Sequence, residues 1–495
     1  MGVQISKESF LPSEHRAFQE RLQRCLTALG ALIDRPGWGT GPTTIGAELE
    51  LVLVGSDGQP RPCNAAVVAE AGDPRVTVEM VRWDLECNLT PQPLLGRPFE
   101  AMARETRELL TWLDVVGETW DARVTPIGIL PTLTTADLNE AALTDSARYR
   151  ALNASLLNAR GSDPFRVRIN GVESLDVTSQ DIGLQGANTS WQVHLRTDPR
   201  AYRSTYNAAQ LATLPVLAVA GNSPLLAGRQ LWDETRIALF KQSLDVRGPE
   251  RRDRRTARVA FGLDWLRTGP LDLFAANVRE HDPLLPVLSE EDPLDALAAG
   301  RIPELAERRL HQSTTWPWNR AVYDHHGGGH LRVELRALPA GPTVEDMLAN
   351  SAFLLGLVIE LREVADDLID CMPFGVARRG FYQAARLGMD AALPWVDLAT
   401  GEPLVLPAVD LAARLLPVAR RGLERAGVAA DEAQRLLAVI DDRVAAGRTG
   451  ARWQRSALES LARTHTRDEA LAALTLRYLD LSSGGAPVHT WPVPA

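Results

Sequence analysis

The strongest constraint on the fold of this 495-residue chain is a strict alternation of apolar and polar side chains in four separate segments. The segments are 45–53, 83–89, 191–196 and 331–337. Successive side chains of a β-strand point to opposite faces, so each segment predicts a strand with one apolar and one polar face. Strands of this kind pair in an antiparallel sheet that covers a core on one side only.

The polar faces of these strands carry carboxylates, arginines and one histidine, where solvent-facing strands usually carry Thr, Lys and Gln. They comprise Glu48 and Glu50, then Asp84, Glu86 and Asn88, then Gln192, His194 and Arg196, then Arg332, Glu334 and Arg336. Like charges on one strand face repel each other, and a divalent cation would relieve that repulsion. Carboxylates suit Mg²⁺ or Mn²⁺, and arginines suit phosphate or carboxylate groups. The alternation alone also fits an ordinary sheet with a wet outer face.

Most of the remaining chain is expected to be helical. Helices are predicted over 14–33, 99–117, 204–220 and 343–370, a hairpin over 320–337, and mostly helix over 377–480. A capping box at Thr343 and Asp346 marks the start of the helix at 343, and the His/Gly-rich stretch 325–330 reads as the hairpin turn. Strands followed by helices, without a βαβ repeat, predict the α+β class.

Composition excludes several classes of function. The net charge of −10 disfavours a nucleic-acid binder, and the basic run 251–258 reads as a solvated loop. The four cysteines form no CxxC pair, and no apolar run is long enough to span a bilayer. The first residues lack the apolar region of a signal peptide, so a cytoplasmic location is expected. Only two lysines occur, and no GxxxxGK[ST] phosphate loop is present. Phosphate would therefore have to be bound by metals and arginines.

Several segments, taken in order, also resemble motifs of a known family. They are TIGAELE at 44–50, ECNLT at 86–90, PIGILP at 126–131, QVH at 192–194, NSP at 222–224 with Arg236 beyond it, RVELR at 332–336 and AARLGMDA at 384–391. Together they resemble the glutamate–cysteine ligases, particularly the bacterial second family of carboxylate–amine ligases. The resemblance extends over about residues 40–430.

That resemblance implies a curved antiparallel sheet related to the glutamine synthetase catalytic fold, flanked by helices, with a helical C-terminal part. The expected division is an N-terminal helix and loop (1–40), an ATP-dependent catalytic domain (41–400) and a helical region packed on it (401–495). The resemblance implies the metal ligands Glu48, Glu50, Glu79, Glu86, His194 and Glu334. It implies catalytic roles for Arg236, Arg332 and Arg336, and cofactor binding by Asn222, Ser223 and Arg236.

The implied reaction joins the γ-carboxylate of glutamate to an amine, cysteine or a related amino acid, through an acyl phosphate, as in glutathione biosynthesis. ATP and Mg²⁺, or Mn²⁺, are the implied cofactors, and the partners are small molecules, with neither nucleic acid nor membrane. The long helices after 343 offer surfaces for a homodimer. The family pattern departs after His194, where Leu195 and Arg196 follow. A different small amine acceptor, or a non-catalytic relative that binds glutamate or nucleotide, therefore stays open.

Overall fold

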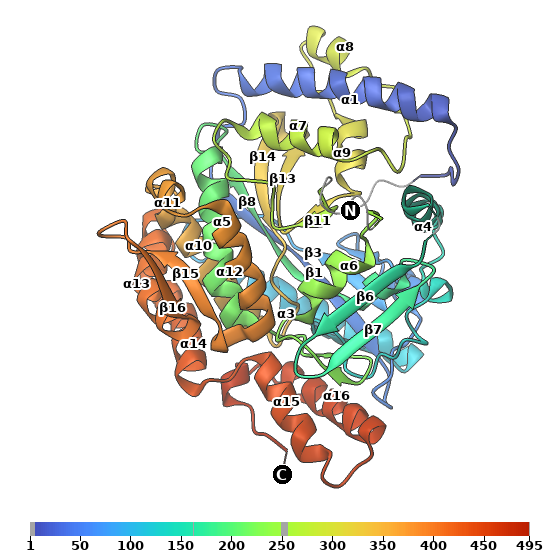
Figure 1. The fold of residues 1–495 in the computed structure, drawn as a ribbon, viewed down its shortest axis with the longest axis vertical. Helices are drawn as coiled ribbons and strands as arrows, with labels where there is room; N and C mark the ends of the chain where they lie inside the picture. The colour runs from blue at the N-terminus through green and yellow to red at the C-terminus, as the bar shows by residue number, and fades with distance from the viewer. Residues whose placement is uncertain (1–4, 162, 249–255, 495) are drawn as a thin grey trace.

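A central antiparallel sheet organises the molecule, which is described here from a computed structural model covering residues 5–161, 163–248 and 256–494 (Figure 1). The sheet runs in the order β13-β14-β8-β1-β3-β2, and β4 and β5 pair with the two ends of β1. Its strands are β1 (Thr44–Val54), β2 (Val76–Val78), β3 (Asp84–Asn88), β4 (Gln92–Pro93), β5 (Arg123–Thr125), β8 (Trp191–Thr197), β13 (Asn319–Asp324) and β14 (His330–Leu335).

The four predicted strands are thus β1, β3, β8 and β14, and they lie consecutively in this sheet in the order β14-β8-β1-β3. Smaller two-stranded pairs surround it. They are β6 (Phe165–Asn170) with β7 (Ser174–Ser179), β9 (Leu225–Leu226) with β10 (Arg229–Gln230), β11 (Val259–Ala260) with β12 (Trp316–Pro317), and β15 (Ala392–Val396) with β16 (Pro403–Pro407).

Helices surround the sheet, and α5 and α10 form much of the core. The helices are α1 (Pro12–Ile33), α2 (Asn64–Ala71), α3 (Pro98–Gly117), α4 (Ala147–Arg160), α5 (Tyr202–Ala220), α6 (Thr235–Ser243), α7 (Pro270–Glu280), α8 (Pro293–Ala298), α9 (Ala306–Gln312), α10 (Val344–Leu361), α11 (Ala365–Cys371), α12 (Phe374–Leu387), α13 (Ala408–Ala426), α14 (Ala430–Ala446), α15 (Gly450–Leu461) and α16 (Arg467–Ser483). Trp191, on the apolar face of β8, donates its indole N–H to Ser351 of α10 at 2.7 Å. The apolar face is therefore covered by helix.

Burial follows the alternation of the strands. Leu49, Leu51 and Leu53 of β1 and Val193 of β8 are at most 1% exposed. Each such side chain contributes roughly 1.5–3 kcal/mol by leaving water. The polar faces of the same strands are left on the opposite side of the sheet, where they meet one another.

Three sequence predictions differ from the structure in detail. The strand expected over 83–89 is shorter, since β3 comprises only Asp84–Asn88, and the helix expected over 343–370 ends at Leu361 before α11 begins. The stretch 377–480 is mostly helical as predicted, but it also contains the β15–β16 hairpin, where Pro394, Pro403 and Pro407 are incompatible with a helix interior. The predicted basic loop at 251–258 lies mostly outside the described residues.

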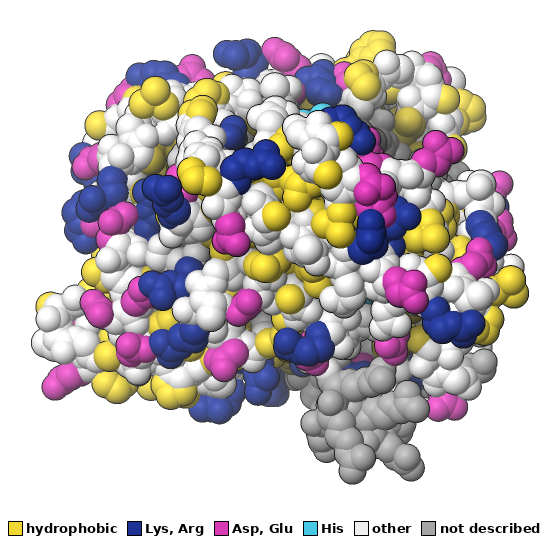
Figure 2. All heavy atoms as spheres, turned by 90° about the horizontal axis from the view of Figure 1, so that it is seen from above, with side chains coloured by type: hydrophobic (Ala, Val, Ile, Leu, Met, Phe, Trp, Pro, Cys, Tyr) yellow, Lys and Arg dark blue, Asp and Glu magenta, His cyan; other side chains and the backbone are white. Residues whose placement is uncertain are grey.

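On the face shown in Figure 2, side chains of both charges are interspersed among apolar ones. Within 5–161, 163–248 and 256–494, no helix combines the length and hydrophobicity that a membrane crossing requires. The proposed division into 1–40, 41–400 and 401–495 stays a prediction.

Candidate active site

The register of the sheet brings the predicted polar side chains into rows across neighbouring strands. Glu50 of β1 lies opposite Glu86 of β3, and His194 of β8 lies opposite Glu334 of β14. Glu48 lies opposite Gln192, one row from His194. Residues that are directly opposite on one face have Cβ atoms about 5 Å apart. Carboxylates, imidazole and guanidinium groups from four strands therefore share one surface.

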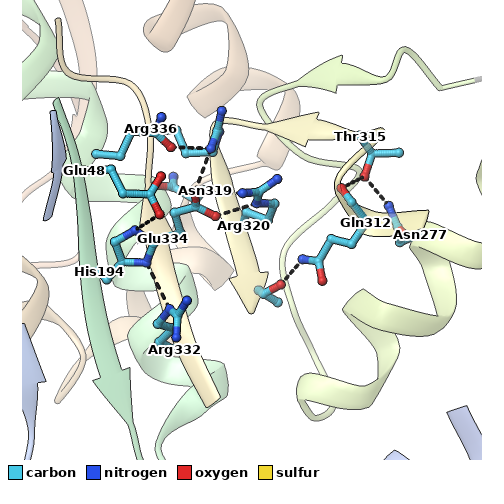
Figure 3. Close-up of polar contacts among 12 residues, drawn as sticks. Glu48, His194, Asn277, Gln312, Thr315, Asn319, Arg320, Arg332, Glu334 and Arg336 are labelled. Atoms are coloured by element: carbon cyan, nitrogen blue, oxygen red, sulfur yellow. Dashed lines mark hydrogen bonds and ion pairs between the residues drawn. The ribbon is translucent and has the colours of Figure 1, made fainter. Parts of the chain in front are cut away.

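One cluster forms around His194 (Figure 3). Its Nε2 atom lies 3.0 Å from Oε1 of Glu48, and Nε of Arg332 donates to its Nδ1 atom at 3.0 Å. Ligand atoms of Glu48, His194 and Glu334 all lie within 4.8 Å of one another. Burial opposes the charge of Glu48, but the nearby His194 outweighs it and lowers the pKa of Glu48 to about 2. Glu48 is therefore ionised at neutral pH.

Glu334 is fully buried and is held between two arginines. Arg320 of β13 contacts both of its carboxylate oxygens, and Nη1 of Arg336 donates to Oε1 at 2.6 Å. Burial would raise the pKa of Glu334, but Arg320 and Arg336 hold it well below its usual range. These charge-assisted bonds fix both guanidinium groups against the sheet.

A second acidic cluster consists of Glu50, Glu79 and Glu86, whose ligand atoms also lie within 4.8 Å of one another. Ser190 and Gln192 donate to the two oxygens of Glu50 at 2.8 and 2.9 Å, and the Tyr149 hydroxyl donates to Glu79 at 3.2 Å. Burial, followed by repulsion between neighbouring carboxylates, raises the pKa of Glu79 and of Glu86 to about 7. Burial raises the pKa of Glu50 to about 7 as well, although Arg336 opposes the shift.

Both clusters have the chemistry of a divalent cation site. In the second cluster the pKa values of all three carboxyl groups are raised, which indicates too little positive charge near them. A divalent cation would supply that charge. Oxygen donors of this kind fit Mg²⁺, and the His194 nitrogen beside Glu48 is a donor that Mn²⁺ accepts.

Two hollows open on the polar face of the sheet, and Glu48 lines both of them. The first hollow is lined by Glu48, Glu50, Glu79, Glu86, Arg148, Tyr149, Gln185, Asn188, Ser190, Gln192, Arg236, Phe240, Trp316, Trp318, Arg320 and Arg336, among others. The second hollow is lined by Thr44, Gly46, Ala47, Glu48, Asn88, Leu89, Pro91, His194, Arg196, Asp324, His330 and Arg332. Two ligands bound in the two hollows would therefore meet at Glu48.

The predicted arginines are divided between the two hollows. Arg236 and Arg336 line the first and Arg332 lines the second. Arg332 is also paired with Asp324, whose Oδ2 atom lies 2.7 Å from its Nη1. Each hollow thus combines carboxylates with at least one guanidinium group.

Asn222 and Ser223 are placed differently, because both are fully buried and neither lines a hollow. The Asn222 backbone N–H and the Ser223 hydroxyl donate to Glu234 at 3.0 and 2.7 Å, and Arg236 donates to the same carboxylate at 3.0 Å. The turn therefore supports Arg236 from behind. A direct contact between this turn and a cofactor stays a prediction.

A family model, described as glutamate-cysteine ligase family 2, matches residues 44–476. The chain belongs to this family. The match begins where β1 begins and includes every residue of the two acidic clusters. Membership in glutamate-cysteine ligase family 2 supports ATP-dependent carboxylate–amine ligation as the class of activity.

One solved structure supports the fold of this family. A glutamate–cysteine ligase from Francisella tularensis, solved in complex with AMP, is 13% identical with a TM-score of 0.55, covering 92% of this chain and 91% of that chain. A bifunctional glutathione synthetase from Pasteurella multocida is 12% identical with a TM-score of 0.47, covering 95% and 55% respectively. No curated protein sequence matches the chain. The predicted α+β fold, a curved antiparallel sheet related to that of glutamine synthetase and flanked by helices, is confirmed.

Sequence reasoning missed several residues of this candidate site. Arg320 pairs with Glu334 across the hairpin, and its position opposite Glu334 in the predicted hairpin could have identified it as a partner of that carboxylate. Glu234 immediately precedes the Thr235-Arg236 pair that the motif did identify. Tyr149 comes from α4, a helix outside every motif.

Proposed function

We propose that this protein joins the γ-carboxylate of glutamate to an amine, cysteine or a related amino acid, at the expense of ATP. Glutamate would bind in the first hollow and ATP in the second. The observation that carries the proposal is that both hollows are lined by Glu48, with one acidic cluster beside each. A reaction between a carboxylate and a phosphoryl group needs this kind of meeting point.

In the proposed reaction an oxygen of the glutamate γ-carboxylate attacks the γ-phosphorus of ATP, and ADP leaves. The resulting acyl phosphate is attacked by the neutral amine, and phosphate leaves as the amide bond forms. Divalent cations held by the carboxylate clusters would neutralise the charge of the phosphate groups. The work of the protein in such a transfer is positioning and electrostatic stabilisation.

The arginines have distinct proposed tasks. Arg332, in the second hollow, would contact the phosphates of ATP, whereas Arg236 and Arg336, in the first, would bind carboxylate oxygens. Arg336 is already fixed by Glu334, and Arg236 by Glu234. An arginine held in this way loses little conformational freedom when its ligand arrives, so it orients the ligand well.

ADP release in the presence of Mg²⁺, glutamate and a panel of amines tests the proposal. Glu48→Ala is expected to lower kcat by on the order of 10²–10³-fold or more, since it removes charge at the meeting point of both ligands. The matched control is Glu20→Gln, an exposed glutamate on α1, which should keep full activity. Near-normal ligation by Glu48→Ala would defeat the assignment.

Hydroxylamine in place of the amine tests the acyl phosphate, because it traps an activated γ-carboxylate as the hydroxamate. The amine panel decides between cysteine and another acceptor. ATP binding without ADP release for every acceptor would instead favour a non-catalytic relative that binds glutamate or nucleotide. Cytoplasmic location and a homodimer stay predictions.

A further inference from the structure

The first hollow contains amide oxygens that have no hydrogen-bond partner among the described residues. They are Oδ1 of Asn188 and Oε1 of Gln185, and both residues line the hollow. A buried acceptor without a donor costs free energy, so native proteins keep such atoms mainly where a ligand or water satisfies them. The same wall contains guanidinium donors and the four carboxylates assigned above to cation binding, so these two oxygens are neutral acceptors that no cation ligand role accounts for.

The orientation of the Asn188 amide follows from its own hydrogen bond. Its Nδ2 atom donates to the backbone carbonyl of Gln185 at 2.8 Å. A flipped amide would place oxygen against oxygen, so Oδ1 is the atom that stays unpaired. Asn188 also continues the polar row of β8, because residues 188, 190, 192 and 194 share one side of the extended chain. Oδ1 is therefore an acceptor on the face of the candidate site.

Asn188 and Arg236 both line the first hollow, and the chain segments that carry them both pack against Gly128. The backbone N–H of Thr189 donates to the carbonyl of Gly128 at 3.1 Å. A Cβ atom built on Gly128 would lie 3.1 Å from Cδ of Arg236. Gly128 thus connects the two residues and leaves space for the arginine. The hollow therefore offers a hydrogen-bond acceptor and a guanidinium donor in the same wall.

An α-amino acid carries an ammonium and a carboxylate group on the same carbon atom. A site that recognises both groups needs an acceptor beside a donor, whereas a simple dicarboxylate needs donors only. We propose that Asn188, assisted by Gln185, is a specificity-determining residue that accepts hydrogen bonds from the α-ammonium of the carboxylate substrate while Arg236 binds its α-carboxylate. This inference rests on the proposed binding of that substrate in the first hollow.

Glutarate is the informative probe, because it is glutamate without the α-ammonium group. The wild-type protein should prefer glutamate over glutarate by at least about tenfold in kcat/KM for ADP release. Asn188→Leu, which has a similar shape and no acceptor, should lower kcat/KM for glutamate at least tenfold and leave glutarate nearly unchanged. Asn188→Asp keeps an acceptor oxygen and should retain the preference. KM for ATP should not change in either variant.

Gln185→Met provides a second variant that does not disturb the Asn188 hydrogen bond to the backbone. It should shift the glutamate-to-glutarate ratio in the same direction by a smaller factor. Calorimetric titration of wild type and variants with each acid gives the same comparison as a ratio of Kd values, without turnover. This binding measurement separates the inference from the proposed function, since it can succeed even if no amine supports ADP release.

The inference is overturned if Asn188→Leu and Gln185→Met keep the wild-type ratio in both measurements. It is also overturned if Asn188→Leu raises only the KM for the acceptor amine, because the amide would then face the other substrate. Wild-type protein that distinguishes the two acids in binding but forms no ADP would instead refute the proposed function.

Discussion

The three-carboxylate cluster of Glu50, Glu79 and Glu86 predicts a strong coupling between cation binding and pH. Each pKa is about 7, against an ordinary value of 4.5, so each shift of about 2.5 corresponds to roughly 3 kcal/mol. Below pH 7 these groups hold protons that a cation must displace. For each proton displaced, the apparent affinity for the cation should rise about tenfold per unit increase in pH between pH 5 and pH 7. Above pH 7 the affinity should become independent of pH.

Titration calorimetry with Mn²⁺, in two buffers that differ in protonation enthalpy, counts the released protons directly. We expect proton release at pH 6 and little at pH 8.5, and Glu79→Gln should release fewer protons than wild type. Glu48 itself should contribute no released proton, because its pKa of about 2 leaves it ionised throughout. Binding that is independent of pH between 5.5 and 7, or equal proton release by Glu79→Gln, would refute this reasoning.

The same shifts predict how stability changes in the metal-free protein. Between about pH 4.5 and 7 the folded state holds more protons at this cluster than the unfolded chain does, so the cluster lowers the free energy of unfolding as pH rises. The difference in unfolding free energy between wild type and Glu79→Gln isolates this contribution. It should grow in favour of the variant from pH 5 to pH 8 and shrink when Mn²⁺ is added. A constant difference would contradict the pKa values.

Three further substitutions test the support of the site. Glu334→Gln leaves Arg320 and Arg336 without their buried counter-charge. It should lower the free energy of unfolding, measured with denaturant at pH 7, by about 3–5 kcal/mol. A loss below about 1 kcal/mol would contradict a stabilising role of these two ion pairs. Tyr478→Phe removes the hydroxyl that accepts a hydrogen bond from Asn222 and donates one to the Pro126 carbonyl. The substitution should lower the free energy of unfolding by about 1–3 kcal/mol and raise KM for glutamate more than KM for ATP. Equal changes in both KM values would argue against a local effect. Gly450→Ala would push a methyl group into the Asn222 side chain and should destabilise the protein by about 1–3 kcal/mol, as measured by thermal unfolding; unchanged stability would show that α15 can move away.

The sheet and its acidic face were predictable because they depend on local alternation. Glu48, Glu50, Glu86, His194 and Glu334 each occupy a polar position of a strand, and strand pairing then brings them together. What the alternation could not indicate was the division into two clusters, since this depends on which strands are neighbours. The structure has two acidic clusters, one beside each hollow.

Contacts between distant residues explain the remaining differences. The burial of Asn222 and Ser223 follows from Gln454 and Tyr478, which lie more than 200 residues later in the chain. No local pattern around 222–224 predicts such partners, so the burial of this turn could not be predicted from the sequence. Asn188 was missed for a different reason. The strand β8 begins only at Trp191, whereas the alternating polar row already starts three residues earlier, at Asn188. The β15–β16 hairpin was missed because its strands are short and contain prolines.

The hydrogen bonds that join Asn222 to Gln454 and to Tyr478 also bear on how the protein is made. A ribosome adds about 5–20 residues per second, so roughly 10–50 seconds separate the emergence of Asn222 from that of Tyr478. During that interval a nascent chain can already contain the paired strands, while the wall that supports Arg236 still lacks its last partners. Enzymatic competence should therefore be acquired late in biogenesis, well after the first acidic strands have folded.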